Sequence, residues 1–179
     1  MNLYKKSLVY KTIKAFKTGK KILKDPKYLE SVSLSVLEQN KTPNRTDIIN
    51  YIISYLNRNV CYLEIGARNP NDNFAHINAI VKYSVDPGVE FKENPVDFKM
   101  TSDVFFELLT KGEILNKDIK FDVIFIDGLH LAEQVDRDVD NALKYLSEDG
   151  FIVLHDCNPP TEWHAREDYY FSHTPAKEL

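Results

Sequence analysis

The chain has 179 residues, a 43% share of apolar residues and a formal net charge of −4. That length favours a single domain, and the apolar share is sufficient for a hydrophobic core. No apolar run reaches about 18 residues, and no signal-peptide pattern precedes the first helix, so we expect a cytoplasmic protein without a membrane span. The two cysteines, Cys61 and Cys157, form no Cys-x-x-Cys pair, which argues against a disulfide framework or a zinc site.

Positive charge is concentrated at the N-terminus. Residues 1–27 contain nine lysines and one acid, a net charge of +8. Such a segment indicates either an anionic partner, such as a membrane surface, or a solvated helix face that covers part of the protein. Lysine stems readily cover apolar surface, which favours the solvated face. Peripheral membrane contact is the alternative, and no nucleic acid partner is expected.

The first elements in the chain are predicted helices. Apolar residues recur at helical spacing over 2–23, Pro26 interrupts the pattern, and a second helix is predicted over 27–38. Residues 40–44 are typical of a linker, after which Thr46 or Asp47 is placed to cap a helix that ends at Leu56. We therefore predict a basic helical segment over 1–44 and a separate domain over 45–179.

From residue 60 onward, short apolar runs alternate with helical patterns. Strands are predicted at 60–65, 82–86, 97–100, 121–127 and 150–155, and helices at 72–81, 102–111 and 131–146. This alternation is typical of a doubly wound α/β fold, in which a mostly parallel sheet has helices on both faces. The tail from Pro159 shows no strand pattern.

Acids stand at the ends of four predicted strands. They are Glu64, Asp86, Asp127 and Asp156. Because the carboxyl ends of parallel strands lie along one edge of a sheet, the four carboxylates are expected together there. Gly66 would let the backbone approach a ligand closely, and Asp86 is placed to bind ribose hydroxyls. This pattern predicts an adenosine-containing cofactor, and helix capping is the alternative role for Asp127 or Asp156.

Two further segments contain candidate catalytic or cofactor-binding residues. His130 lies just beyond Asp127 and Gly128, where a neutral histidine can act as a general base or can be an ordinary loop residue. Ser102 and Asp103 open the predicted helix 102–111, so either residue caps that helix or contacts an adenine ring.

Oxygen ligands also gather near the end of the fifth predicted strand. Asp127, Asp156 and Asn158 together offer a donor set that suits Mg²⁺ or another hard divalent metal. An acidic edge without a metal is the alternative.

In this order, the motifs resemble those of class I S-adenosylmethionine (SAM)-dependent methyltransferases, in particular macrocin-type and catechol-type O-methyltransferases. The resemblance covers residues 45–165 and implies a Rossmann-like fold, with SAM bound by residues in the first, second, third and fourth motifs. These are Glu64, Ile65, Gly66, Ala67, Asp86, Ser102, Asp103, Asp127 and Gly128. It also implies a second metal ligand at the segment His155-Asp156. The family's last two strands have no counterpart before Leu179, so we expect a sheet that lacks them.

The resemblance implies an O-methyltransferase acting on a hydroxyl of a sugar or another small molecule. His130 or His155 would take the proton, with a divalent metal as a possible aid. The expected partner is a small-molecule or glycan substrate, and a second copy of the chain is a further candidate. The alternatives are a non-catalytic or truncated binding domain of the same fold and an NAD-dependent oxidoreductase, which would need the Gly-x-Gly-x-x-Gly turn that Gly66 alone does not provide.

Overall fold

The computed structural model describes residues 8–157, and the chain divides into two compact units. One comprises residues 1–42 and 158–179, and the other residues 43–157. The predicted metal ligand Asn158, the tail from Pro159 and the first residues of the predicted helix 2–23 lie outside the described residues. Within residues 8–157, no helix is both long and apolar enough to cross a membrane.

The described part of the first unit consists of two helices, α1 (Leu8–Ile22) and α2 (Pro26–Gln39). Asp25 caps α2, since its side chain accepts hydrogen bonds from the backbone N–H groups of Lys27 at 3.0 Å and Tyr28 at 3.3 Å. Pro26 occupies the first helical position, where its missing N–H and fixed φ cost nothing. The proline that interrupts the first helix therefore begins the second.

The second unit is built on a four-stranded parallel sheet. Its strands are β1 (Cys61–Ile65), β2 (Val81–Val85), β3 (Phe121–Ile126) and β4 (Leu146–Leu154). They are arranged in the order β2-β1-β3-β4, with every neighbouring pair parallel. The predicted α/β class and strand alternation are confirmed.

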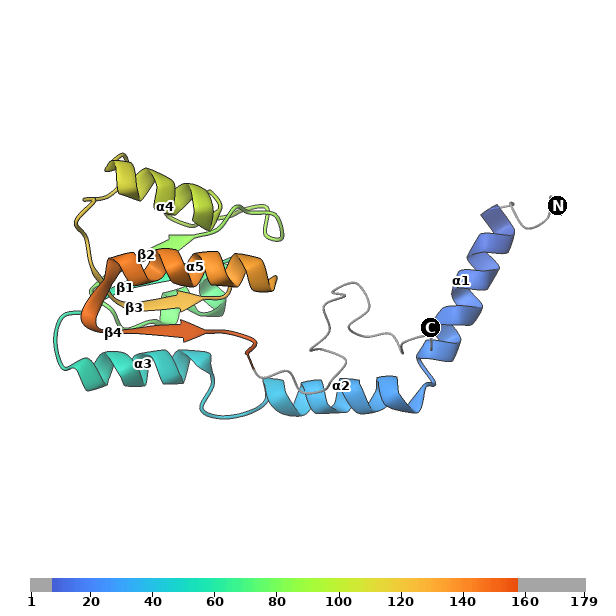
Figure 1. Ribbon diagram of the computed structural model, residues 1–179. Helices are drawn as coiled ribbons and strands as arrows, with labels where there is room; N and C mark the ends of the chain where they lie inside the picture. The colour runs from blue at the N-terminus through green and yellow to red at the C-terminus, as the bar shows by residue number, and fades with distance from the viewer. Residues whose placement is uncertain (1–7, 158–179) are drawn as a thin grey trace. The chain divides into compact units, whose positions relative to one another are not determined.

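Helices cover both faces of this sheet (Figure 1). On one face, α3 (Arg45–Leu56) buries Ile49 and Ile53 against Tyr62, Val123 and Phe125. On the other face, α4 (Ser102–Lys111) and α5 (Ala132–Tyr145) form a second core with the alternate strand residues. That core consists of Leu63, Ile65, Val85, Phe105, Phe106, Leu109, Phe121, Ile124, Ile126, Ala142 and Tyr145. Side chains that alternate along each strand therefore divide between the two faces, as in a doubly wound fold.

Two predicted elements take a different form. The predicted strand 97–100 is reduced to one parallel bridge, between Phe98 and Val85 at the edge of the sheet. The predicted helix 72–81 is replaced by two short 3₁₀ turns, Pro70–Asp72 and Phe74–His76. Asparagine side chains compete with helical hydrogen bonding here, because Asn69 caps the first turn and the buried Asn73 separates the two turns at φ −150°.

Two helix caps also differ from the expected ones. Asn44, rather than Thr46 or Asp47, caps α3, and Asp47 completes a capping box by accepting from the Asn44 backbone N–H. Thr101, rather than Ser102 or Asp103, caps α4. In both helices the cap lies one to three residues earlier in the chain than expected, which leaves Thr46, Ser102 and Asp103 available for other contacts.

Candidate functional site

The carboxyl ends of the four strands lie along one edge of the sheet, and backbone hydrogen bonds extend this alignment beyond the strands. The N–H of Asp127 donates to Ile65 O at 2.9 Å, and that of His155 donates to Ile126 O at 3.0 Å. The N–H of Gly66 donates to Val85 O at 2.8 Å. The residues that follow β1, β3 and β4 are therefore held in register, and the predicted gathering at one edge is confirmed.

Strand periodicity explains which side chains meet at this edge. In β1 and β3, Tyr62 and Phe125 pack against α3. Residues two positions further along a strand point to the same face, so Glu64 and Asp127 also lie on the α3 side. His155 follows the partly buried Val153 of the same core by the same spacing. The period-two pattern therefore brings these polar groups beside the N-terminus of α3.

Gly66 makes this arrangement possible. Its φ is +84°, and a Cβ at this position would lie 2.1 Å from the backbone oxygen of Asp127. Both the left-handed backbone and the close approach exclude an ordinary side chain. The glycine after β1 thus lets the turn lie directly against Asp127, the residue that follows β3.

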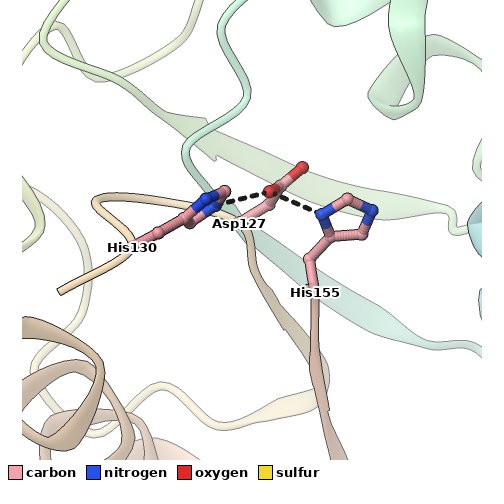
Figure 2. Close-up of side chains that lie close together, drawn as sticks. All are labelled: Asp127, His130 and His155. Carbon is pink, nitrogen blue, oxygen red and sulfur yellow. Dashed lines mark hydrogen bonds and ion pairs between the residues drawn. The ribbon is translucent and has the colours of Figure 1, made fainter. Parts of the chain in front are cut away.

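Asp127 is the centre of the site (Figure 2). Its Oδ1 lies 3.2 Å from His130 Nε2 and 3.0 Å from His155 Nδ1. Burial opposes ionisation of Asp127, but the contacts with the two histidines and the charge of Arg45 outweigh it and lower the pKa of Asp127 to about 2. The same contacts raise the pKa of both histidines above their ordinary value of 6.5. Asp127 is therefore an ionised carboxylate shared by two imidazoles.

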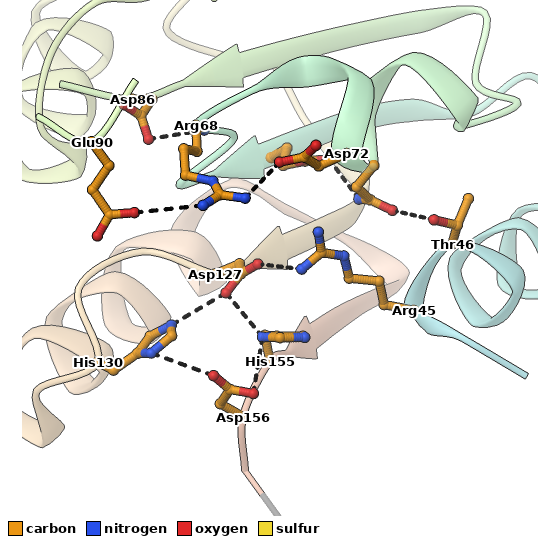
Figure 3. A network of polar contacts seen from close by, with 12 residues as sticks. Arg45, Thr46, Arg68, Asp72, Asp86, Glu90, Asp127, His130, His155 and Asp156 are labelled. Carbon is orange, nitrogen blue, oxygen red and sulfur yellow. Dashed lines mark hydrogen bonds and ion pairs between the residues drawn. The ribbon is translucent and has the colours of Figure 1, made fainter. Parts of the chain in front are cut away.

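The second oxygen of Asp127 binds a residue from a distant part of the chain. Arg45 Nη1 donates to Asp127 Oδ2 at 2.9 Å (Figure 3). Arg45 is the first residue of α3, and the packing of Ile49 and Ile53 on the sheet fixes its position. Sequence reasoning missed Arg45, because nothing in the local pattern distinguishes it from a solvated residue of the first helical turn.

Helix capping does not explain Asp127. The residue before α5 is Leu131, which makes no side-chain cap hydrogen bond. Both Asp127 oxygens instead face charged or titratable side chains. Asp156 joins the cluster from the turn after β4, with its carboxylate 3.5 Å from His130 Nδ1 and 3.2 Å from His155 Nδ1.

Glu64 lies deeper on the same side, where only 2% of the residue is exposed. Its Oε2 accepts hydrogen bonds from Tyr62 Oη at 2.6 Å and Asn73 Nδ2 at 2.9 Å, and Asn73 Oδ1 accepts from Thr46 Oγ1 at 2.7 Å. Burial raises the pKa of Glu64 to about 7, although both hydrogen bonds act in the opposite direction. Near neutral pH, the buried carboxyl group of Glu64 is therefore present in both its protonated and its ionised form.

Asp86 directly follows β2 and is held by two backbone N–H groups. Its Oδ2 accepts from Arg68 N at 3.0 Å and its Oδ1 from Gly88 N at 2.6 Å. The turns after β1 and β2 are thus joined through this carboxylate. Each oxygen retains a lone pair for a further donor, as ribose binding would require.

A family model described as a methyltransferase domain matches residues 37–157 of this chain. The match spans α3, all four strands and every described residue of the site. The chain belongs to this family. No curated protein and no solved structure matches it.

The family places the chain among the class I SAM-dependent methyltransferases, and the NAD-dependent alternative is wrong. The family implies SAM as the methyl donor, and the chain's own residues fit that cofactor. Glu64, Gly66 and Asp86 share one edge of the sheet, and Asp86 is fixed by backbone groups with acceptor capacity remaining. An acid at the end of the second strand is what an adenosyl ribose requires.

The positions expected near adenine lie between α4 and α5. Gln134 Nε2 donates to Ser102 Oγ and Asp103 Oδ1, both at 3.3 Å, and to Asp138 Oδ1 at 3.0 Å. A Cβ on Gly128 would lie 3.7 Å from Asp138 Oδ2, so this polar group adjoins the turn after β3. Gln134 and Asp138 are almost fully buried, and both belong to this polar group, although the sequence analysis did not identify them. Their polarity on an otherwise apolar helix face was the available signal.

In the described part of the chain, Asp127, His130 and His155 offer donor atoms close enough to share a metal ion, all within 4.8 Å of one another. The predicted set was Asp127, Asp156 and Asn158, of which Asn158 lies outside the described residues. The two histidines introduce nitrogen donors into a site that the sequence indicated as all-oxygen. Such a mixed set suits Zn²⁺, Mn²⁺ or Fe²⁺ better than Mg²⁺.

Proposed function

We propose that this methyltransferase transfers a methyl group to a hydroxyl of a small molecule such as a sugar, and that His155 is the general base. The observation that supports this proposal is the pair of histidines on the ionised, largely buried Asp127. This cluster shares the sheet edge with Glu64 and Asp86. A base is therefore held beside the residues best suited to the cofactor.

The two histidines differ in what they offer to an acceptor. Both nitrogens of His130 face carboxylates, Nε2 facing Asp127 and Nδ1 facing Asp156. His155 directs Nδ1 toward the same two carboxylates, and among the described residues its Nε2 has no hydrogen bond or ion pair. With Nδ1 oriented by Asp127, the neutral imidazole presents Nε2 as the proton acceptor.

The cofactor would be held by residues of the strand ends. Asp86 would bind the ribose, the turn at Gly66 would line the amino-acid part, and Ser102 with Asp103 would lie toward the adenine. When bound, SAM supplies a methyl group on a sulfonium that is open to direct displacement. The chain's own contribution is to hold the acceptor oxygen close and in line, to remove its proton, and to exclude water.

A metal-assisted variant of this site would use Asp127, His130 and His155 as ligands. Arg45 already supplies a positive charge to Asp127, and a metal would have to displace protons from both histidines, so binding would weaken steeply below their raised pKa values. For these reasons we propose that a histidine, rather than a metal ion, is the principal group that activates the acceptor hydroxyl. Activity measured after chelation and after addition of Mn²⁺, Zn²⁺ or Mg²⁺ distinguishes a metal-assisted reaction from a metal-independent one.

The test measures release of S-adenosylhomocysteine with a panel of hydroxylated acceptors, including sugars, sugar nucleotides and catechols. His155→Gln is expected to lower kcat about a hundredfold or more, with the Kd for SAM unchanged. His76→Gln is the matched control, because the His76 side chain is exposed and, among the described residues, its ring bonds to the Asn71 backbone oxygen, at 3.1 Å, and to no residue of the site. An active enzyme in which His155→Gln and His76→Gln behave alike would contradict the role of His155. Tight SAM binding without turnover on any acceptor would support the non-catalytic alternative instead.

A further inference from the structure

Helix α1 carries an exposed apolar stripe that no described side chain covers. Ile13 is 51% exposed and Phe16 is 73% exposed, and Leu23, directly after the helix, is 61% exposed. Their spacings of three and seven residues place them on one side of the helix. An exposed apolar stripe of this kind indicates a contact surface for a membrane or for another molecule.

The rest of the helix surface is basic. Lys11, Lys14, Lys17, Lys20, Lys21 and Lys24 are all exposed, and no acid occurs between residues 8 and 24. Lys11, Lys14 and Lys21 lie on the side away from Phe16, and Lys17 and Lys24 flank the stripe. Lys20, four residues after Phe16, lies on the same side as the stripe, where its long stem can carry the charge to the surface. The helix therefore combines an apolar side with flanking and opposite positive charge.

We propose that α1 lies in the interface of an anionic lipid bilayer, with Ile13, Phe16 and Leu23 directed into the acyl boundary and the lysines bound to headgroup phosphates. Helices of this composition bind bilayers by apolar burial together with attraction to anionic lipids. Lysine stems are long enough to reach the phosphates while the helix axis stays at the surface.

The composition favours a lipid surface over other anionic partners. Residues 1–44 contain no arginine, the residue that reads phosphates and bases bidentately in nucleic acids. Nucleic acid binding would also leave Phe16 and Ile13 in water. A second copy of α1 would bring two lysine-rich surfaces together, which like-charge repulsion opposes.

The test is co-sedimentation of the full chain with vesicles of phosphatidylcholine alone and of phosphatidylcholine mixed with phosphatidylserine. We expect binding to the anionic vesicles and little to the neutral ones. The combined change Lys14→Glu, Lys17→Glu and Lys21→Glu is expected to lower the partition coefficient at least roughly a hundredfold. Phe16→Ala is expected to lower it about tenfold, because a large buried side chain is lost.

The matched control reverses three exposed lysines of the second unit, Lys92→Glu, Lys99→Glu and Lys117→Glu, which makes the same change in net charge. This variant is expected to retain binding. Unchanged helical circular dichroism and SAM affinity establish that each variant is folded. A Phe16→Trp probe in a Trp163→Phe background is expected to shift its fluorescence to the blue on anionic vesicles.

Four outcomes would overturn the proposal. They are no sedimentation of the full chain with anionic vesicles, equal loss of binding in the control variant, no blue shift on binding, and tighter binding to single-stranded RNA than to vesicles. None of them bears on methyl transfer, so this proposal and the proposed function fail independently.

Discussion

Replacement of Glu64 by glutamine tests the electrostatics of the cofactor edge. Burial raises the pKa of Glu64 from 4.5 to about 7, and each pKa unit corresponds to about 1.4 kcal/mol. An acid whose pKa is raised in the folded state stabilises the fold fully below its unfolded pKa, and that contribution is lost as pH rises through the folded pKa. Between pH 4.5 and 7 the wild-type chain should therefore lose about 3 kcal/mol through this one group.

Glu64→Gln removes the titration but keeps a side-chain oxygen that can accept from Tyr62 and Asn73. At pH 8 the variant is expected to be more stable than wild type by up to about 3 kcal/mol, and at pH 4.5 the two should be similar. The assay is urea unfolding of both proteins at several pH values, compared as the difference in free energy of unfolding.

Glu107→Gln is the matched control, because the Glu107 side chain is 61% exposed and, within residues 8–157, forms its ion pair with Lys111 on the same helix. Because this side chain is exposed, the substitution is expected to change the free energy of unfolding by no more than about 0.5 kcal/mol at each pH. A Glu64→Gln difference that is equally flat would refute the assignment of a raised pKa to Glu64. If Glu64 also binds the cofactor, the variant will gain stability while its Kd for SAM rises.

Asp127→Asn should move the acidic limb of the kcat/KM profile to lower pH, because both histidines lose the carboxylate that raises their pKa; an unmoved limb would mean that neither histidine is the base. Gly66→Ala should cost about 2–5 kcal/mol in urea unfolding, from the left-handed backbone and the clash with the Asp127 turn. Gly112→Ala, also left-handed but with its nearest neighbour at 3.7 Å, should cost about 1 kcal/mol, and equal losses would disprove the clash. Ile49→Ala should cost about 2–5 kcal/mol, whereas Ile48→Ala, at a site 42% exposed, should cost about 1 kcal/mol or less; similar values would contradict the docking of α3.

The sequence was sufficient to predict elements whose hydrophobic pattern is strong. Apolar residues predominate in β1 and β3, and an acid stands next to the carboxyl end of each strand. Helices α4 and α5 have clear helical periodicity, and all four elements lie close to their expected bounds. Because the carboxyl ends of parallel strands lie along one edge of the sheet, the strand prediction alone placed Glu64, Asp86 and Asp127 at that edge.

The remaining features depend on tertiary contacts that no local pattern records. Asn73 is polar in a stretch that otherwise favours a helix, but its hydrogen bonds to Glu64 and Thr46 take it into the core and break that helix. Phe98 pairs at a single position, because Asp97 instead binds the Ser84 N–H at 2.9 Å and hydroxyl at 2.7 Å. Arg45 reaches Asp127 only because α3 docks on the sheet.

The link between Arg45 and the histidines has a consequence for folding. Arg45 and His155 stand 110 positions apart in the chain, yet both contact the same carboxylate. Closing so long a loop is slow relative to local helix formation, so the site forms only when the first and last elements of its unit have both docked. During synthesis, a ribosome-bound fragment that ends before β4 can build the first strands but lacks His155, so completion of the cluster on Asp127 would mark completion of the unit.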